Sequence, residues 1–408
     1  MIRNAIKFVS CLIILSITGC ANIASLLSTP TPVSTSQATA TPQPLPSATP
    51  TSSSQNQARL LRIWLPPRFD PKGDSASAKM LAQRLTDFES AHPGLRIDVR
   101  IKAEDGTASL LNALTITHDA APASLPDLIA LPRHDLVIAA TNGLLHPMDG
   151  LSTLLDDPSW YPFARELGHV QNIGYGLPFA SNALVLIHRT DLEINSWDDI
   201  LASKKLLLFP AGDTQSLFLL SLYKSAGGKL TDDQGKPTLQ ETPLTETLTL
   251  LQNGYEAKIF SSSILSYKTD DQAVQAYHAG QGSMLVTWAT NTNESIQPLP
   301  ALAAPHTFAD GWIWALAGSS TENQQLAVEL AEYLLSDDFS PQWIKSAGYL
   351  PVRLSEDPVD GSILESAQLM PNEDVLDVLG PIMNQMLIRL LEGEQVDVLV
   401  QSALDQIK

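Results

Sequence analysis

The sequence predicts an α/β fold of two lobes, each a mostly parallel sheet flanked by helices, joined by hinge segments that cross between them. Short apolar runs typical of buried strands alternate with segments of helical periodicity along most of the chain. One strand–helix–strand succession near residue 60 is typical of a parallel strand pair with a right-handed crossover. The 408 residues also exceed what one domain of ~100–200 residues usually holds.

The amino-terminal body contains the clearest strand and helix patterns. Residues 60–65 form an apolar run that ends at two prolines, and apolar side chains over 78–88 recur at helical spacing. Residues 95–101 alternate between apolar and charged side chains, which predicts a half-exposed strand. A third short strand is predicted at 127–131. Together these elements predict a βαβ unit and its neighbouring strand.

The carboxy-terminal half repeats the alternation of strands and helices. The predicted strands cover 183–187 and 283–288, and the predicted helices cover 273–277, 321–336, 377–391 and 395–407. Ser320 or Thr321 is available to cap the helix at 321–336. The alternation therefore continues to the end of the chain, which is long enough for two lobes, each with its own sheet.

The amino terminus has the pattern of an export signal. Arg3 and Lys7 precede an apolar run over 8–15 that is too short to span a bilayer. The run ends in Ile17-Thr18-Gly19-Cys20, which resembles the lipobox of bacterial lipoproteins and implies cleavage after residue 19 and lipidation of Cys20. Residues 20–57 carry no charge and are rich in Pro, Ser and Thr, which predicts a disordered tether.

Composition excludes several classes of function. The chain has 44 acidic and 25 basic side chains, a formal charge of −19, and no basic stretch of the kind that nucleic acids require. Both cysteines lie within the first twenty residues. A disulfide framework, a cysteine-ligated metal and a cysteine nucleophile are therefore excluded for the body of the protein.

Motifs for catalysis are absent from the sequence. There is no Gly-x-Ser-x-Gly elbow, no His-Glu-x-x-His and no phosphate-binding Walker loop. Acidic residues occur as adjacent pairs such as Asp198-Asp199, whose side chains diverge and so favour caps and turns over a glycosidase pair. We therefore expect no enzyme activity, no metal site and no cofactor.

A series of short motifs in a fixed order resembles family 1 of the bacterial extracellular solute-binding proteins, the maltose-binding-protein-like receptors of ABC importers. The motifs lie at 62–64, 88–93, 126–129, 143–145, 176–192, 196–200, 227–232, 280–284 and 348–353. The resemblance implies two lobes, 58–180 plus 300–338 and 184–296 plus 341–408, with crossings near 179–183 and 296–300. Bending at the crossings would close the lobes on a solute.

The same resemblance implies a function. It implies a receptor tethered by lipid to the extracytoplasmic side of the cell envelope, which delivers a small polar solute, first of all a carbohydrate, to the membrane subunits of an ABC importer. We expect it to act as a monomer.

Candidate ligand-binding residues are those that suit a sugar, which needs flat aromatic faces and polar groups for its hydroxyls. Trp288 ends a predicted strand and precedes a polar run, Trp312 and Trp314 alternate so that one can reach the cleft, and Tyr349 lies in a turn. Asn182 lies in the crossing segment, where maltose-binding protein carries a glutamate. Arg68 and His134 are predicted on loops at strand ends, where open α/β sheets bind ligands.

Three alternatives remain open from the sequence. The same fold could bind a polyamine, a metal ion or a phosphate ester, and an acidic cleft would favour a cation. The chain could be a tethered secreted hydrolase, or a receptor that signals through a membrane sensor instead of an importer.

Overall fold

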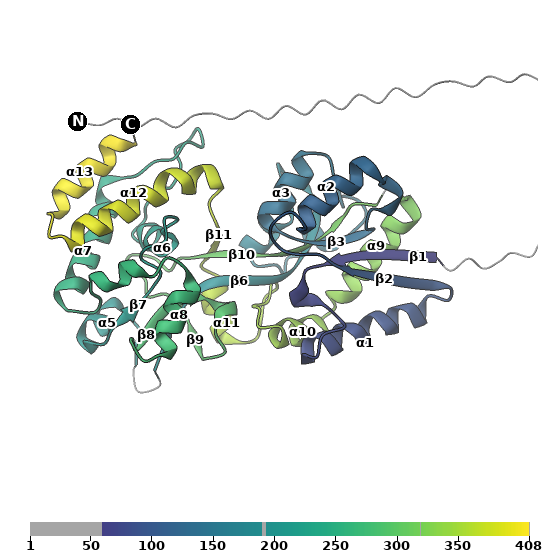
Figure 1. Ribbon diagram of the computed structural model, residues 1–408, viewed down its shortest axis with the longest axis horizontal. Helices are drawn as coiled ribbons and strands as arrows, with labels where there is room; N and C mark the ends of the chain where they lie inside the picture. The colour runs from purple at the N-terminus through teal and green to yellow at the C-terminus, as the bar shows by residue number, and fades with distance from the viewer. Residues whose placement is uncertain (1–58, 190–192, 319, 408) are drawn as a thin grey trace, which may run out of the picture. The chain divides into compact units, whose positions relative to one another are not determined.

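A computed structural model describes residues 59–189, 193–318 and 320–407 (Figure 1). These residues belong to one compact unit that starts at Asn56. The predicted signal segment, Cys20 and the whole of the predicted tether lie outside the described residues. Within the described ranges, no helix has the length and apolar character needed to cross a bilayer.

The amino-terminal strands form the βαβ unit that the sequence predicts. Strand β1 (Arg59–Leu65) pairs in parallel with β2 (Leu95–Ile101) on one side and with β3 (Leu128–Pro132) on the other. Helix α1 (Ala76–Ala91) makes the crossover, and the Ser75 hydroxyl caps it by accepting the Ala78 N–H at 3.1 Å. The predicted periodicity is confirmed, because α1 buries Leu81, Leu85 and Phe88.

Two long strands connect the two halves of the sheet. Strand β6 (Gly176–His188) and strand β10 (Thr307–Leu316) are antiparallel, and β10 also pairs antiparallel with β3. The far half of β6 pairs with β8 (Met284–Trp288) and β9 (Ile296–Gln297), while β7 (Leu207–Leu208) adds in parallel to β8. The main order is β2-β1-β3-β10-β6-β8-β7, and β11 (Ala367–Leu369) pairs in parallel with β10.

Two large hydrophobic cores lie along this sheet, as expected for two α/β lobes. The strands pass from one core to the other near Ala183–Leu184 in β6 and between Phe308 and Ala309 in β10. The first core is covered by α1, α2 (Leu110–Ala120), α3 (Arg133–Thr141), α4 (Pro162–Leu167), α9 (Thr321–Leu334), α10 (Ser340–Ser346) and α11 (Pro358–Leu364). The second core is covered by α5 (Trp197–Ser203), α6 (Leu217–Ser225), α7 (Glu241–Glu256), α12 (Glu373–Leu391) and α13 (Val396–Gln406).

The remaining elements are short. Helix α8 (Asp270–His278) packs in a small third cluster with Ile187, Leu208 and Leu285. Strands β4 (His169–Val170) and β5 (Ile173–Gly174) form a separate hairpin. The 3-10 helices are η1 (Pro67–Phe69), η2 (Pro122–Ser124), η3 (Leu154–Asp156), η4 (Ser262–Ser266) and η5 (Ala289–Asn291).

Membership of the cores differs from the predicted lobe boundaries at two places. Helices α10 and α11 bury side chains in the first core, whereas the prediction assigned 341–408 to the second lobe. The reason is aromatic packing: the Trp343 ring lies 5.6 Å from Phe179 and 5.7 Å from Phe69, centroid to centroid. The second change of core also falls within β10 and not at 296–300.

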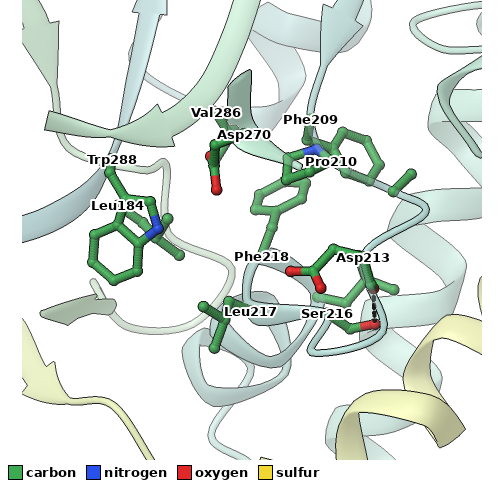
Figure 2. A pocket seen from close by; sticks show the side chains of 12 residues that line it. Leu184, Phe209, Pro210, Asp213, Ser216, Leu217, Phe218, Asp270, Val286 and Trp288 are labelled. Atoms are coloured by element: carbon green, nitrogen blue, oxygen red, sulfur yellow. Dashed lines mark hydrogen bonds between the residues drawn. The ribbon is translucent and has the colours of Figure 1, made fainter. Parts of the chain in front are cut away.

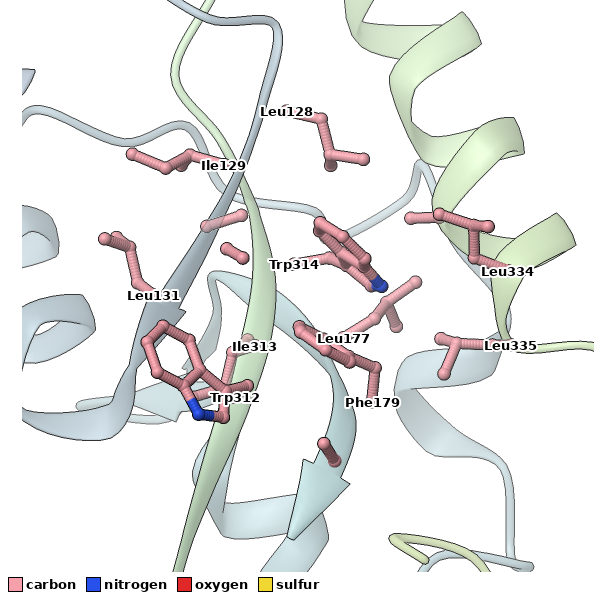
Figure 3. Packing of buried hydrophobic residues seen from close by; sticks show 14 of the residues in the cluster. Leu128, Ile129, Leu131, Leu177, Phe179, Trp312, Ile313, Trp314, Leu334 and Leu335 are labelled. Carbon is pink, nitrogen blue, oxygen red and sulfur yellow. The ribbon is translucent and has the colours of Figure 1, made fainter. Parts of the chain in front are cut away.

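An aromatic cluster fixes the contact between β6 and β10 (Figure 3). Phe179 is an extra residue in β6, since Ala180 pairs with Trp312 and Pro178 pairs with Ile313. Its ring stacks on the fully buried Trp314, with centroids 4.3 Å apart. This packing holds β10, and therefore Trp312, in a defined position beside β6.

Candidate functional site

A cavity of about 440 Å³ lies between elements of the two cores. This volume is within the ~300–1,000 Å³ typical of small-molecule sites. All six residues predicted to bind ligand line it. The full lining consists of Arg68, Glu104, Asp105, Pro132, His134, Asp135, Asn182, Trp288, Thr290, Asn291, Asp310, Gly311, Trp312 and Tyr349.

The wall from the first core is built on Arg68, which lies in η1 and not in a loop as predicted. Its guanidinium forms a bidentate pair with Glu104, with Nε 2.7 Å from Oε1, and it donates to the Tyr349 hydroxyl. Trp312 Nε1 donates to the same hydroxyl at 3.1 Å. Burial lowers the pKa of Arg68, but hydrogen bonds to Glu104 and Tyr349 and their charges raise it above its ordinary value overall. Arg68 is therefore a fixed cation whose charge is matched by Glu104.

The aromatic side chains of this wall hold one another in place. The Arg68 guanidinium lies 5.6 Å from the centre of the Trp312 ring, and Phe69 packs edge-on against the same ring at 5.7 Å. Of the two alternating tryptophans, only Trp312 lines the cavity, while Trp314 is enclosed in the core. Burial raises the pKa of Tyr349, against the lowering effect of Arg68.

The wall from the second core carries Trp288 and a clamp between Asn182 and Thr290. Trp288 ends β8 and is half-buried against the second core. The Asn182 side chain donates to the Thr290 hydroxyl at 2.9 Å and accepts the Thr290 N–H at 3.1 Å. One N–H and one lone pair of the Asn182 amide remain available to a ligand.

His134 lies in the first turn of α3, which corrects its predicted place on a loop. Helix α3 begins directly after β3, so the end of the strand and the start of the helix share this edge of the cavity. The half-exposed imidazole lies 3.4 Å from Glu373 at the start of α12. This contact joins a helix of the first core to a helix of the second.

Two partly buried acids, Asp310 and Asp135, complete the cavity. Asp310 accepts the Gly311 N–H at 2.7 Å, and burial raises its pKa to about 6, opposed by the backbone N–H and charge of Arg133. Burial also raises the pKa of Asp135, while His134 lowers it and Asp105 raises it further. Asp310 is directly opposite Asn182 in the β6–β10 ladder, so the two strands bring an amide and a carboxyl together.

A smaller cavity of about 20 Å³ is also lined by Trp288. Figure 2 shows the carboxylates of Asp213 and Asp270 directed toward this space, with Phe218 and Leu217 beside them. Burial raises the pKa of Asp270 to about 6, and the charges of Asp213 and Asp271 add to the effect, whereas the hydrogen bond to Thr287 lowers it. Trp288 therefore borders both the large polar cavity and this small one.

The prediction missed several lining residues, of which Glu104, Asp105 and Asp310 matter most. Glu104 and Asp105 follow β2 closely, and the rule that selected Arg68 and His134 at strand ends applies to them as well. Asp310 had a different signal, because it is a lone acid within the apolar strand β10. Among the described residues, no group of three His, Cys, Asp or Glu side chains is placed to hold a metal ion.

The sequence matches the model of a family described as bacterial extracellular solute-binding protein over residues 83–371. The chain belongs to this family. The resemblance found in the sequence is thereby confirmed at the level of the family, whose members are binding proteins. No curated protein matches this solute-binding protein.

Solved structures share the fold of this solute-binding protein. The cyclic α-maltosyl-1,6-maltose binding protein from Arthrobacter globiformis has a TM-score of 0.67 at 15% identity, covering 85% of this chain and 97% of its own. The sugar-binding protein MalE from Xanthomonas citri has a TM-score of 0.67 at 18% sequence identity, and the match covers 85% of this chain and 96% of that protein. A solute-binding protein from Thermotoga lettingae bound to α-D-tagatose has a TM-score of 0.60 at 19% sequence identity, and the match covers 86% of this chain and 100% of that protein. The predicted two-lobe α/β fold is confirmed.

Proposed function

We propose that this protein is an extracytoplasmic receptor that binds a carbohydrate in the cavity between its two cores and presents it to an ABC importer. One observation carries the proposal: three aromatic rings, those of Trp288, Trp312 and Tyr349, line one cavity together with polar side chains. Aromatic faces suit the C–H faces of sugar rings, and neighbouring amides and hydroxyls suit sugar hydroxyls.

The solved relatives support this ligand class. They include proteins that bind a cyclic maltosyl-maltose and α-D-tagatose, and a sugar-binding protein. Because their sequences are 15–19% identical to this one, they support carbohydrate as a class and indicate no particular sugar.

The cavity walls suit hydroxyl recognition at specific atoms. The unused N–H and lone pair of Asn182 face a site whose other side carries the Arg68–Glu104 pair. Thr290 and Asn291 add a hydroxyl and an amide to the second wall. A ligand held between these walls would contact both cores at once.

We propose that the two cores are the two lobes and that β6 and β10 are their hinge. One lobe would then comprise residues 59–183 and 309–369, and the other would comprise 184–308 and 370–407, following the side chains that pack in each core. Compared with the predicted boundaries, residues 341–369 move to the first lobe and residues 300–308 move to the second. Bending at the two strands would bring Trp288 toward Trp312.

We also propose that Cys20 carries the lipid that tethers the receptor. The basic residues, the short apolar run and the Ile17-Thr18-Gly19-Cys20 motif support this. Cys20→Ala is expected to abolish lipidation and release the protein from membranes, measured by metabolic labelling with a fatty acid and by fractionation. Full membrane retention of a labelled Cys20→Ala protein would contradict the proposed anchor.

A thermal-shift screen of the full chain tests the ligand class. Sugars, polyamines, inorganic phosphate and divalent cations are added separately, because a ligand that binds only the folded state raises the unfolding temperature by mass action. We expect shifts with carbohydrates, confirmed by calorimetric titration. Shifts confined to phosphate, metal ions or polyamines would contradict the proposal.

A further inference from the structure

The walls of the proposed sugar site carry more negative charge than a neutral sugar requires. Four lining side chains are carboxyls, namely Glu104, Asp105, Asp135 and Asp310, and the lining has one arginine and one histidine. Arg68 is matched by Glu104 in a bidentate pair. The remaining three carboxyls therefore set the charge of the cavity.

Asp310 has a structural partner for its charge. It accepts the Gly311 N–H at 2.7 Å and a backbone N–H from Arg133, at the amino-terminal end of α3. The positive end of a helix favours an acid there. This arrangement also occupies the α3 terminus, so the helix end is not available to a phosphate.

Asp105 and Asp135 lack such partners, apart from the charge of His134, which lowers the pKa of Asp135. Within the described parts of the chain, no lysine or arginine forms an ion pair with either carboxyl, and neither accepts a hydrogen bond from another residue. The two are close enough that Asp105 raises the pKa of Asp135. Closure of the site around a ligand would remove water from both, and burying unpaired carboxylates is costly unless a cation joins them.

The other walls limit which cation fits. The rings of Trp288, Trp312 and Tyr349 favour an ammonium group next to apolar carbon, since ring faces attract cations. The amide and hydroxyl groups of Asn182, Thr290 and Asn291 line the same cavity and suit ligand hydroxyls, which a simple polyamine does not carry. The cavity of about 440 Å³ is also far larger than a metal ion needs.

We propose that the solute is a carbohydrate with a protonated amine, an amino sugar or a short oligomer of one, whose ammonium group binds at Asp105 and Asp135. This inference rests on the proposed function and narrows its ligand class. The aromatic rings hold the sugar faces, and the two aspartates select the amine. The formal charge of −19 on the whole chain adds a long-range attraction for the same cation.

Matched sugars that differ only in the substituent at carbon 2 of each ring test the proposal. Glucosamine is compared with glucose, galactosamine with galactose, and the glucosamine disaccharide of chitosan with cellobiose and N,N′-diacetylchitobiose. Calorimetric titration of the full chain at pH 6 should show the amine binding roughly tenfold to hundredfold tighter than its neutral partner in at least one pair. The acetylated disaccharide should bind like cellobiose, and added salt should reduce the advantage of the amine.

Asp105→Asn and Asp135→Asn should each remove most of the preference for the amine, measured as the ratio of the affinities for the amine and for its neutral partner in the same variant. Asp233→Asn, a change at an exposed residue outside the cavity lining, is the control and should alter neither affinity. Asp105 is exposed, so its substitution is compatible with folding even if Asp135→Asn is not.

The outcomes separate this inference from the proposed function. Neutral sugars that bind as tightly as the amines in every pair would overturn the inference and leave a carbohydrate receptor. Spermidine that binds more tightly than every sugar, or no binding of any sugar, would overturn both.

Discussion

Trp288 is the residue on which the proposed site depends most, because it ends β8 and borders both the large and the small cavity. Trp288→Ala removes a large apolar face whose burial contributes about 1.5–3 kcal/mol, so sugar affinity should fall roughly 10- to 150-fold. Tyr255→Ala is a matched control, since its ring is also half-buried against the second core but lies outside both cavities. Calorimetry should show weaker binding for Trp288→Ala alone, and equal losses in both variants would assign Trp288 to packing.

Asn182 is expected to contribute less to sugar affinity than Trp288, but it should contribute to the stability of the fold as well. Asn182→Ala removes the remaining bond to the sugar, worth about 0.5–1.5 kcal/mol, and also the two hydrogen bonds that hold Thr290. Both the affinity and the free energy of unfolding should therefore decrease in calorimetric and urea titrations. If Asn182→Ala lost affinity but kept the free energy of unfolding of the parent, the two hydrogen bonds to Thr290 would not contribute to stability.

Asp270 should make stability depend on pH. Its folded pKa of about 6 lies above the ordinary value, so ionisation is less favourable in the folded state. The resulting loss in the free energy of unfolding is absent below about pH 4, grows as the pH rises, and reaches its full value above about pH 6. The facing acids Asp213 and Asp271 raise this pKa, and Thr287 lowers it.

Asp270→Asn tests this dependence. Because one pKa unit corresponds to about 1.4 kcal/mol, the variant should gain about 1–3 kcal/mol over the parent between pH 4 and pH 6.5. Urea unfolding at several pH values measures the difference. If the free energies of unfolding of the variant and the parent differed by the same amount at every pH in that range, Asp270 would have the same pKa in the folded and the unfolded chain.

At the scale of elements, the contact between β6 and β10 decides how the lobes are joined. A Cβ on Gly176 would lie 2.4 Å from the carbonyl oxygen of Trp314, so no other residue fits there without moving a strand. Gly176→Ala should lower the free energy of unfolding by about 1–3 kcal/mol.

The control is Gly361→Ala, because a Cβ there meets nothing within 4 Å and the residue lies within α11. It should be neutral or stabilise by up to about 1 kcal/mol. Urea titrations compare the two variants, and a stable Gly176→Ala protein would show that the strands separate at no cost.

The elements that the sequence predicted are those whose pattern is local. Strand β2 alternates and α1 has a full apolar stripe, so both could be recognised without neighbours. Strand β10 was not predicted as a strand, although Trp312 and Trp314 were seen to alternate, because an acid and a glycine interrupt its apolar run. That acid, Asp310, is explained only by α3, a helix far away in sequence.

In the candidate site, too, features that depend on single residues could be predicted and contacts between distant residues could not. The sequence identified six lining residues from aromatic type and from position at strand ends, and the structure brings all six to one cavity. It could not show that Asn182 is tied to Thr290 or that Arg68 is neutralised by Glu104, since both pairs form through folding. Whether the six contact a ligand stays a prediction.

For the whole molecule, the two-core arrangement predicts closure on binding. A saturating sugar should reduce the radius of gyration of the full chain, measured by small-angle X-ray scattering, because the ligand contacts both cores. Trp288→Ala at the same sugar concentration serves as the control and should stay expanded. A confirmed ligand that leaves the scattering unchanged would indicate a rigid receptor.

The first core is discontinuous in sequence, since it combines residues up to Val185 with Ala289 and with residues from Ala309 to Ala367. During synthesis, β3 can therefore pair with β10 only after β10 has been made. In the same way, Phe179 can pack against Trp314 and Trp343 only after those residues have been made. The second core is completed only by the final helix, which buries Leu399 and Ala403. We therefore expect that neither core closes on a growing chain until nearly all of its described residues have left the ribosome, which would keep the polypeptide unfolded for passage through a membrane.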